Sequence, residues 1–231
     1  MQEPVADATR RFLAAISPLT NEQMSVPSRL PAWSRGHVAT HIARNADAMV
    51  NLCVWASSGV QSPMYRSQEE RDSQIELGAR RSASQIVTDV SDSAERLAVA
   101  FEALSDSALK SLIRRGAAAV GPLSPASAIP WLRLKEVEIH LVDLDLSPTF
   151  ADTSVEFLMR LLTEEVPNFD SRMMGLTLIT KEGPVFKIGD GVQRITGSTG
   201  DITAWLLGRS KETEISRLSS DAPIATPPRW L

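Results

Sequence analysis

Apolar residues recur at steps of three and four between residues 84 and 104, and this periodicity constrains the fold more than any other feature. The positions are Ile86, Val90, Ala94, Leu97, Phe101 and Leu104. Such spacing places these side chains on one face of an α-helix. A long helix with one apolar face must pack against other elements, which favours a helical bundle.

Three further segments are predicted to be long helices. Residues 4–17 are amphipathic and end at Pro18. Residues 34–59 begin at Ser34, a suitable N-cap, and are apolar over more than half of the circumference, as in a buried helix. Residues 127–146 form the fourth. Four long helices with one or two long connections predict a four-helix bundle.

The two connections differ in composition. Residues 60–81 are read as a polar connection. Residues 110–125 break the helical period and contain two glycines, which predicts a short hairpin or an irregular loop.

A boundary is expected at Ser147-Pro148, which divides the chain into domains 1–148 and 149–231. The second domain is predicted to be a small α+β unit, so the whole chain is α+β but mainly α. Its expected elements are a helix over 154–166, strands over 174–181, 185–188 and 193–196, a helix over 201–208 and a coil tail.

Composition excludes several classes of function. The 231 residues carry a net charge of −4 and no run of Lys and Arg, so no nucleic-acid surface is expected. No apolar stretch reaches the ~18 residues of a membrane span, and the N-terminus lacks the apolar core of a signal peptide. The single cysteine, Cys53, cannot form an internal disulfide, and a cytoplasmic protein is the expectation. Oligomeric state is not encoded in any recognisable pattern.

Glu136 and His140 lie four residues apart within a predicted helix and therefore share a face. His37 and His41 have the same spacing on another helix. Carboxylates and imidazoles that project inward from facing helices form the metal sites of helical bundles. A set of His and Glu ligands with open positions suits catalytic Zn²⁺, and other divalent ions would also fit. The alternative is that these residues make ordinary polar contacts.

His41 is favoured over His37 as the ligand because it lies one turn deeper in its helix. Asn45 and Asp143 are placed to hydrogen-bond the ligands, although ordinary polar roles are equally expected. Cys53 stands among apolar residues and is read as a buried structural residue. The motifs of serine hydrolases, P-loop proteins and dinucleotide-binding proteins are absent.

Several segments together resemble the mycothiol-dependent maleylpyruvate isomerases. They are PAWSRGHVATHIARNADAMVNLCVWASSGVQSPMY, RSQEERDSQIELGA, PWLRLKEVEIHLVDLDL and the terminal PPRWL. The resemblance spans nearly the whole chain. It implies a DinB-like metal-binding four-helix bundle followed by a sterol-carrier-like α+β domain.

The resemblance also implies site residues. The metal ligands would be His41, Glu136 and His140, which agrees with the choice of His41 made from its depth in the helix. Arg71 and Arg209 would bind the carboxylates of the substrate, and the cleft between the two domains would hold the site. No residue is assigned to the thiol cofactor.

The implied reaction is the cis–trans isomerisation of maleylpyruvate to fumarylpyruvate in gentisate-type aromatic catabolism. A thiolate adds reversibly to the double bond of this dicarboxylate. Because the chain offers no suitable cysteine, the thiol would come from mycothiol, activated by a divalent metal, most simply Zn²⁺. Two alternatives remain: a metal-dependent mycothiol S-transferase of the same superfamily, and a non-catalytic metal- or lipid-binding protein.

Overall fold

The computed structural model describes residues 2–169 and 175–227, so most of the terminal PPRWL segment lies outside the described residues. The chain divides into two compact units, Met1–Leu146 and Ser147–Leu231. Each unit is described by itself below. The expected class, mainly helical with a small α+β part, is confirmed.

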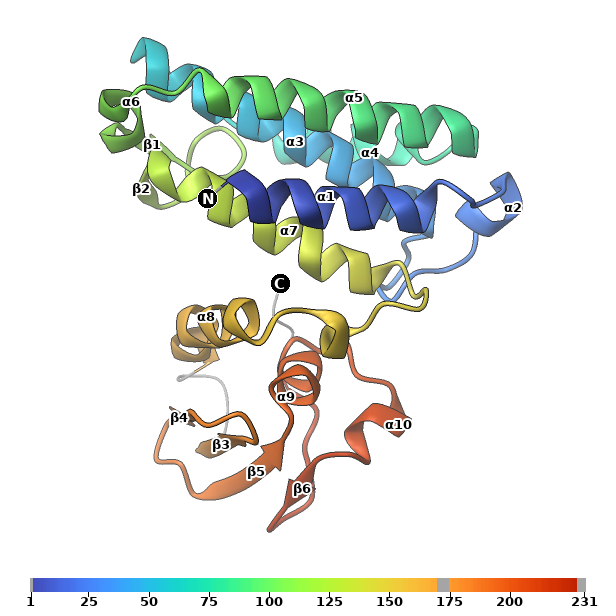
Figure 1. Cartoon of the computed structure of the whole chain (residues 1–231), viewed down its shortest axis with the longest axis vertical. Coiled ribbons are helices and arrows are strands. Elements are labelled where there is room, and N and C mark those ends of the chain that lie inside the picture. The colour runs from blue at the N-terminus through green and yellow to red at the C-terminus, as the bar shows by residue number, and fades with distance from the viewer. Residues whose placement is uncertain (1, 170–174, 228–231) are drawn as a thin grey trace. The chain divides into compact units, whose positions relative to one another are not determined.

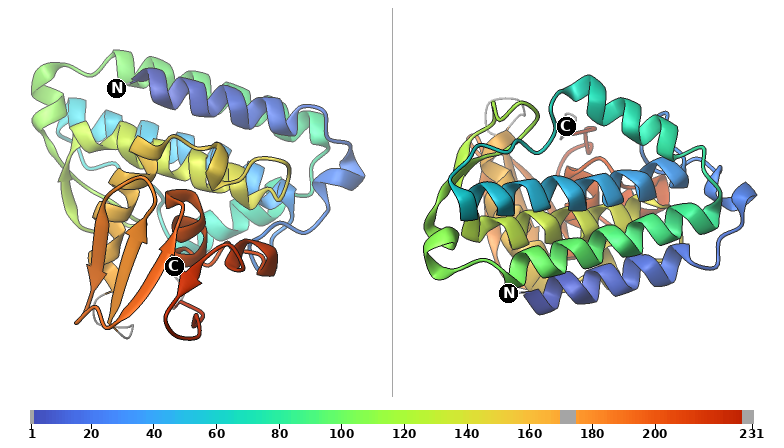
Figure 2. Two further views of the ribbon diagram at one scale, coloured as in Figure 1. Left: turned by 60° about the horizontal axis from the view of Figure 1, so that its bottom comes forward. Right: turned by 90° about the horizontal axis from the view of Figure 1, so that it is seen from above.

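Four long helices build the first unit: α1 (Gln2–Ile16), α3 (Arg35–Ser58), α5 (Ala83–Glu102) and α7 (Ile129–Asp143). Figure 2 shows them running alongside one another, with α3 packed against both α5 and α7. Helix α3 begins at the predicted N-cap, since the Ser34 hydroxyl accepts from the His37 backbone N–H. It ends at Gly59, whose φ of 72° is a left-handed conformation that glycine adopts without strain.

The apolar stripe of α5 faces the bundle interior as predicted. Ile86 and Val90 are fully buried in one half of the core, and Leu97 and Phe101 are buried in the other half. Buried side chains of this kind each contribute on the order of 1.5–3 kcal/mol to folding. The long helices are therefore held together mainly by their apolar faces.

The polar connection over 60–81 contains a helix that was not predicted, α4 (Gln68–Gly78). The Ser67 hydroxyl caps this helix by accepting from the Glu70 N–H. Only Ile75 and Gly78 are buried in α4, so the segment shows no apolar stripe in the sequence. Shorter elements that the sequence did not reveal are α2 (Asn21–Met24) and α6 (Asp106–Lys110).

The region over 110–125 forms the hairpin alternative. Strands β1 (Leu112–Arg114) and β2 (Leu123–Pro125) pair antiparallel, with Ile113 opposite Ser124. A short 3-10 helix, η1 (Ala126–Ala128), leads directly into α7.

The second unit contains a four-stranded sheet in the order β4-β3-β5-β6. The central strands are parallel, and both outer strands are antiparallel to their neighbours. The strands are β3 (Leu176–Thr180), β4 (Val185–Ile188), β5 (Gln193–Gly197) and β6 (Ser219–Ser220). The helical elements are η2 (Phe150–Asp152), α8 (Val155–Glu165), η3 (Val166–Phe169), α9 (Thr199–Leu206) and α10 (Glu212–Ile215). Figure 1 labels α8 and α9, which pack against each other.

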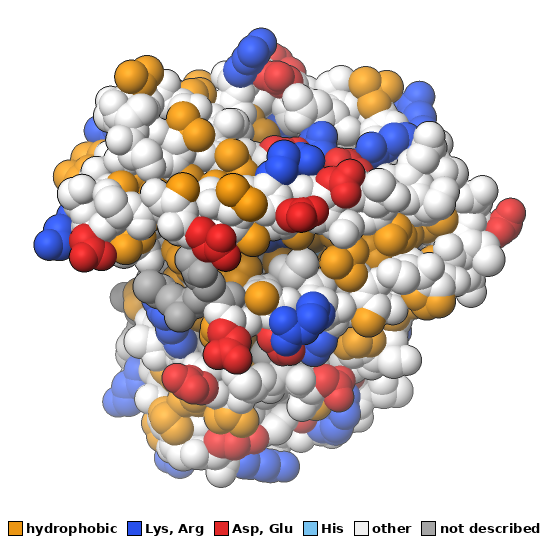
Figure 3. All heavy atoms as spheres, turned by 45° about the horizontal axis from the view of Figure 1, so that its top comes forward, with side chains coloured by type: hydrophobic (Ala, Val, Ile, Leu, Met, Phe, Trp, Pro, Cys, Tyr) orange, Lys and Arg blue, Asp and Glu red, His pale blue; other side chains and the backbone are white. Residues whose placement is uncertain are grey.

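Acidic and basic side chains are interspersed on the molecular face drawn in Figure 3. On α1, Asp7 pairs with both Arg10 and Arg11. Within the described part of the chain, no helix is both long and apolar enough to cross a bilayer.

Candidate metal centre

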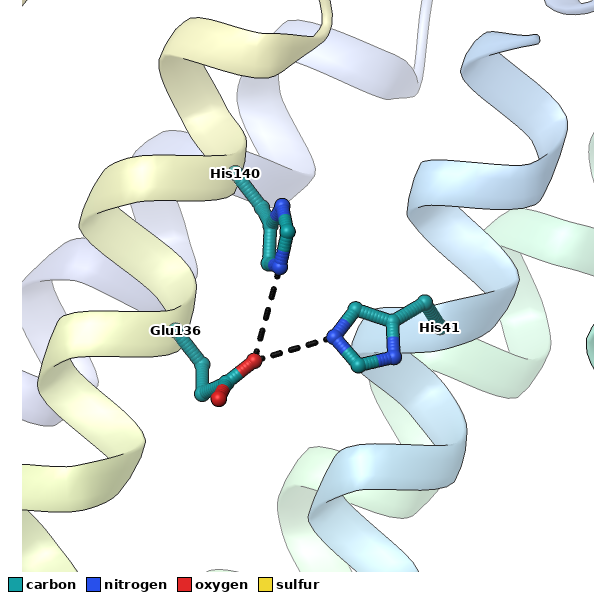
Figure 4. A group of neighbouring side chains, drawn as sticks. All are labelled: His41, Glu136 and His140. Carbon is teal, nitrogen blue, oxygen red and sulfur yellow. Dashed lines mark hydrogen bonds and ion pairs between the residues drawn. The ribbon is translucent and has the colours of Figure 1, made fainter. Parts of the chain in front are cut away.

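Helix α3 carries His41 into the bundle interior. The first turn of α3 is fixed by a capping box in which Ser34 and His37 satisfy each other's backbone N–H groups. His41 follows one turn later and is only 4% exposed. Its ring faces α7, the helix that carries the other two candidate ligands (Figure 4).

Helix α7 supplies Glu136 and His140 from successive turns of one face (Figure 4). Oε2 of Glu136 lies 2.9 Å from Nε2 of His41 and 3.4 Å from Nε2 of His140. One ligand atom from each of the three residues lies within 4.8 Å of the others. The Glu136 side chain is 34% exposed, so solvent and small molecules can reach the carboxylate. One carboxylate and two imidazoles with an open side match a catalytic divalent-metal site.

The two histidines have opposite pKa shifts. Burial lowers the pKa of His41 to about 4, and the positive charges of His140 and Arg71 add to this effect. Burial also lowers the pKa of His140, but hydrogen bonds to Asp143 and Glu136 outweigh it and raise the pKa to about 9. The difference arises because His140 has a second carboxylate beside it, whereas His41 has a guanidinium.

Glu136 remains ionised at neutral pH. Burial raises its pKa, but the hydrogen bonds to His140 and His41 together outweigh burial and hold the pKa well below its ordinary value. The triad therefore combines a carboxylate, a neutral imidazole and an imidazolium. Such a set can bind a cation once His140 gives up its proton.

Asp143 orients His140. Its Oδ2 lies 2.9 Å from Nδ1 of His140, and the Asp143 side chain is fully buried. A carboxylate on Nδ1 fixes the ring and leaves Nε2 as the nitrogen directed at the triad, which is the usual support for a metal-binding histidine. The sequence placed Asp143 among the candidates for this role.

Asn45, the other such candidate, has a different partner. Nη1 of Arg133 donates to Oδ1 of Asn45 and to the backbone oxygen of Ile42, both at 2.8 Å. Arg133 is completely buried one turn before Glu136 on α7. Burial lowers the pKa of this guanidinium to about 10, so it is still a cation at neutral pH. The sequence analysis did not single out Arg133, because one arginine in a helix carries no periodic signal.

The structure separates His37 from the triad. Nε2 of His37 lies 3.0 Å from Oε2 of Glu76, and its Nδ1 contacts Ser34. His37 therefore has a structural role at the start of α3.

Helix α4 brings Arg71 to the triad. Nη2 of Arg71 lies 3.3 Å from Nδ1 of His41, and Nη1 donates to Asp72 at 2.8 Å. Its Cζ lies 6.0 Å from the ring centroid of Trp33 and 5.8 Å from that of Tyr65. These two rings support the guanidinium through cation–π contact. Arg71 is thus a fixed positive charge at the edge of the candidate metal centre.

Arg209 lies in the second unit, directly after α9. Its backbone N–H donates to Ala204, and its Nη1 donates to the Leu207 carbonyl at 2.7 Å. Its role toward a substrate stays a prediction from the resemblance.

Cys53 is 2% exposed within the apolar core of the bundle. Burial raises the pKa of its thiol to about 12. Since the thiolate is the reactive form, Cys53 is unsuited to nucleophilic chemistry at neutral pH.

Comparison with known proteins adds to this geometry. Residues 5–145 match the family described as the mycothiol maleylpyruvate isomerase N-terminal domain. A crystal structure of the mycothiol-dependent maleylpyruvate isomerase has a TM-score of 0.91 and 29% identity, covering 99% of this chain and 95% of that one. The structure of a histidine-to-alanine mutant of that enzyme matches with the same TM-score and coverage at 28% identity. No curated protein matches at a comparable level.

The family match covers well over half of the chain and contains the three residues of the triad, Arg71 and Asp143. The structural match extends over the second unit as well. The chain belongs to the mycothiol maleylpyruvate isomerase N-terminal domain family.

Proposed function

We propose that this protein is a mycothiol-dependent maleylpyruvate isomerase that converts maleylpyruvate to fumarylpyruvate. The observation that carries the proposal is the triad of His41, Glu136 and His140 beside Arg71, in a chain similar over nearly its full length to such an isomerase. The proposed metal is Zn²⁺, which accepts His and Glu ligands and leaves positions open.

The three triad residues would hold the ion through the two Nε2 atoms and the Glu136 carboxylate. When bound, the ion supplies a Lewis acid that lowers the pKa of a coordinated thiol, as it does for bound water. Asp143 keeps the His140 ring oriented through Nδ1. His41 is neutral at physiological pH and needs no deprotonation to serve as a ligand.

The thiol has to come from outside the chain, because Cys53 is buried and its pKa is raised to about 12. Mycothiol would supply the thiolate whose reversible addition to the double bond permits rotation about the resulting single bond. The addition and loss balance without oxidant, reductant or net proton transfer. The site therefore has to position the substrate and stabilise negative charge on its oxygens.

Arg71 is suited to a substrate carboxylate. A guanidinium only donates hydrogen bonds, so its contact with His41 requires a lone pair on Nδ1. Ligation of a metal through Nε2 leaves the proton of neutral His41 on Nδ1, which removes that lone pair. Arg71 is then available to a carboxylate, which its planar fork binds through both oxygens.

The test is an assay of purified, zinc-loaded protein that follows fumarylpyruvate formation with and without mycothiol. Mycothiol-dependent conversion supports the proposal. If maleylpyruvate is unchanged while mycothiol becomes attached to an electrophile, the protein is a thiol S-transferase that uses the same triad.

A further inference from the structure

The bundle contains a second polar feature, a cavity of about 390 Å³ between α3, α4 and the chain that joins them. This volume lies within the range of small-molecule sites. Its polar lining includes Arg44, Asp47, Asn51, Arg66, Glu70 and Gln74. None of these residues belongs to the triad.

The charges in this lining balance. Two arginines face two carboxylates, and Arg44 is already paired with Asp47 at 2.9 Å and with Asp89 at 2.6 Å. A cavity that binds an anion or a cation would carry an excess of the opposite charge. Alternating donors and acceptors without net charge suit a neutral ligand that is rich in hydroxyl groups.

One buried donor among the cavity residues, Nε of Arg44, has no hydrogen-bond partner in the part of the chain that the structure describes. The buried hydroxyl of Tyr65 lies beside the Arg71 side chain. Buried polar atoms are nearly always satisfied, so an exception calls for a ligand or a functional reason. Burial raises the pKa of Tyr65 to about 12, which keeps the hydroxyl protonated as a donor.

The walls of the cavity are fixed by hydrogen bonds. The Asn51 side chain donates to the backbone oxygens of Pro63 and Met64, both at 3.3 Å. On the other side, the Ala118 N–H from the β1–β2 loop donates to the backbone carbonyl oxygen of Tyr65 at 2.8 Å. The connection therefore has a defined conformation, and a ligand would lose little free energy in ordering it.

The cavity begins close to the triad. Arg44 and Ala48 follow His41 at helical spacing on the same face of α3, and Asn51 continues the row. With a rise of ~1.5 Å per residue, this row extends from roughly 5 to 15 Å beyond His41. Tyr65 lines the cavity, its ring lies 5.8 Å from Cζ of Arg71, and the Glu136 charge acts on its hydroxyl.

We propose that this cavity binds the sugar portion of the thiol cofactor while the thiol reaches the triad. Mycothiol carries its cysteine on an N-acylated glucosamine joined to inositol, a neutral unit rich in hydroxyls. The inference rests on the proposed function for the identity of the thiol. It adds a cofactor site within the first unit and predicts selectivity for a sugar-bearing thiol over a small one.

The test variant is Glu70→Ala combined with Gln74→Ala. Both side chains line the cavity, and Nε2 of Gln74 donates to the Glu70 carboxylate at 3.2 Å. The matched control is Glu69→Ala with Ser73→Ala, an exposed pair with the same spacing on α4 that does not line the cavity. Equal far-ultraviolet circular dichroism and metal content establish that both variants are folded.

The first measurement is calorimetric titration of the zinc-loaded protein with N-acetylglucosaminyl-inositol, which has no thiol and cannot ligate the metal through sulfur. The wild type and control should bind it, and the cavity variant should bind at least about tenfold more weakly. Absence of binding to the wild type, or equal binding to the variant, would overturn the inference. This result does not depend on isomerase activity.

The second measurement is the KM for thiols in the isomerase assay. The cavity variant should raise the KM for mycothiol about tenfold or more, with kcat at saturating thiol and the KM for maleylpyruvate unchanged. The KM for N-acetylcysteine, which lacks the sugar, should stay as in the wild type. Equal increases for both thiols would show that the residues act on the triad instead. If the wild type has no isomerase activity but binds the sugar probe, the proposed reaction fails and the cavity assignment stands.

Discussion

Nε2 of His41 lies 2.9 Å from Oε2 of Glu136, although 95 residues separate them in the chain. The contact joins α3 to α7 and brings a neutral imidazole against a carboxylate in the bundle interior. Bringing these two polar side chains into the bundle interior costs desolvation free energy, which a bound cation would offset.

Replacing any one of the three triad residues, His41→Ala, Glu136→Ala or His140→Ala, should weaken metal binding by more than about a hundredfold, because two ligands remain. Metal content after dialysis, measured by atomic emission, and isomerase activity should fall together.

His37→Ala is the control, since His37 pairs with Glu76 away from the triad. It should keep the metal and lose no more than about 1 kcal/mol of stability through the weakened helix cap. Full metal content in any triad variant would remove that residue from the ligand set.

Zinc binding to protein stripped of metal should release about one proton at pH 7, because His140 is protonated below its pKa of about 9 and a ligand must be neutral. His41, with a pKa of about 4, contributes none. Apparent affinity should therefore rise about tenfold per pH unit between pH 6 and 8. Calorimetry in buffers of different ionisation enthalpy measures the number of protons released when zinc binds. Asp143→Asn should lower that number, because loss of the Asp143 carboxylate lowers the pKa of His140. A count of zero at pH 7 would contradict the raised pKa.

Arg71→Ala should lower kcat/KM for maleylpyruvate by roughly 10- to 100-fold, the usual effect of losing a charge-assisted hydrogen bond. Arg71→Lys keeps the charge but loses the planar fork, so it should restore only part of the activity. Steady-state kinetics with metal content measured in parallel separates substrate binding from metal loss. Loss of zinc in Arg71→Ala would mean that the arginine acts on the triad and not on the substrate.

Cys53 should not react with a thiol reagent at pH 8 in the folded protein, because it is buried and the pKa of its thiol is raised to about 12. Reaction should follow the addition of denaturant, with one thiol titrated per chain. Cys53→Ala should keep mycothiol-dependent turnover and lose about 1–2 kcal/mol of stability from the cavity left in the core. Loss of turnover in a folded, zinc-loaded Cys53→Ala protein would restore the protein thiol as a participant.

Local periodicity determined much of the fold. The apolar repeat of α5 and the Ser34 cap of α3 are visible in the sequence, because backbone geometry fixes which side chains share a helix face. For the same reason, the shared face of Glu136 and His140 could be predicted from their spacing. Helix α4 could not, since its burial is confined to two residues and leaves no repeat to detect.

The candidate site depended on contacts between helices. His37 and His41 lie four residues apart on one helix, so their spacing does not show which of them is the ligand. Only packing turns His41 toward Glu136 of α7, while His37 pairs with Glu76 of α4. The same packing brings Arg71 to His41 and buries the Tyr65 hydroxyl beside Arg71. The sequence alone determined which residues lie on one helix face, because that relation is set by the 3.6-residue turn. Which faces meet, and at what depth, was decided only by the tertiary structure, because it depends on how apolar surfaces from distant segments pack together.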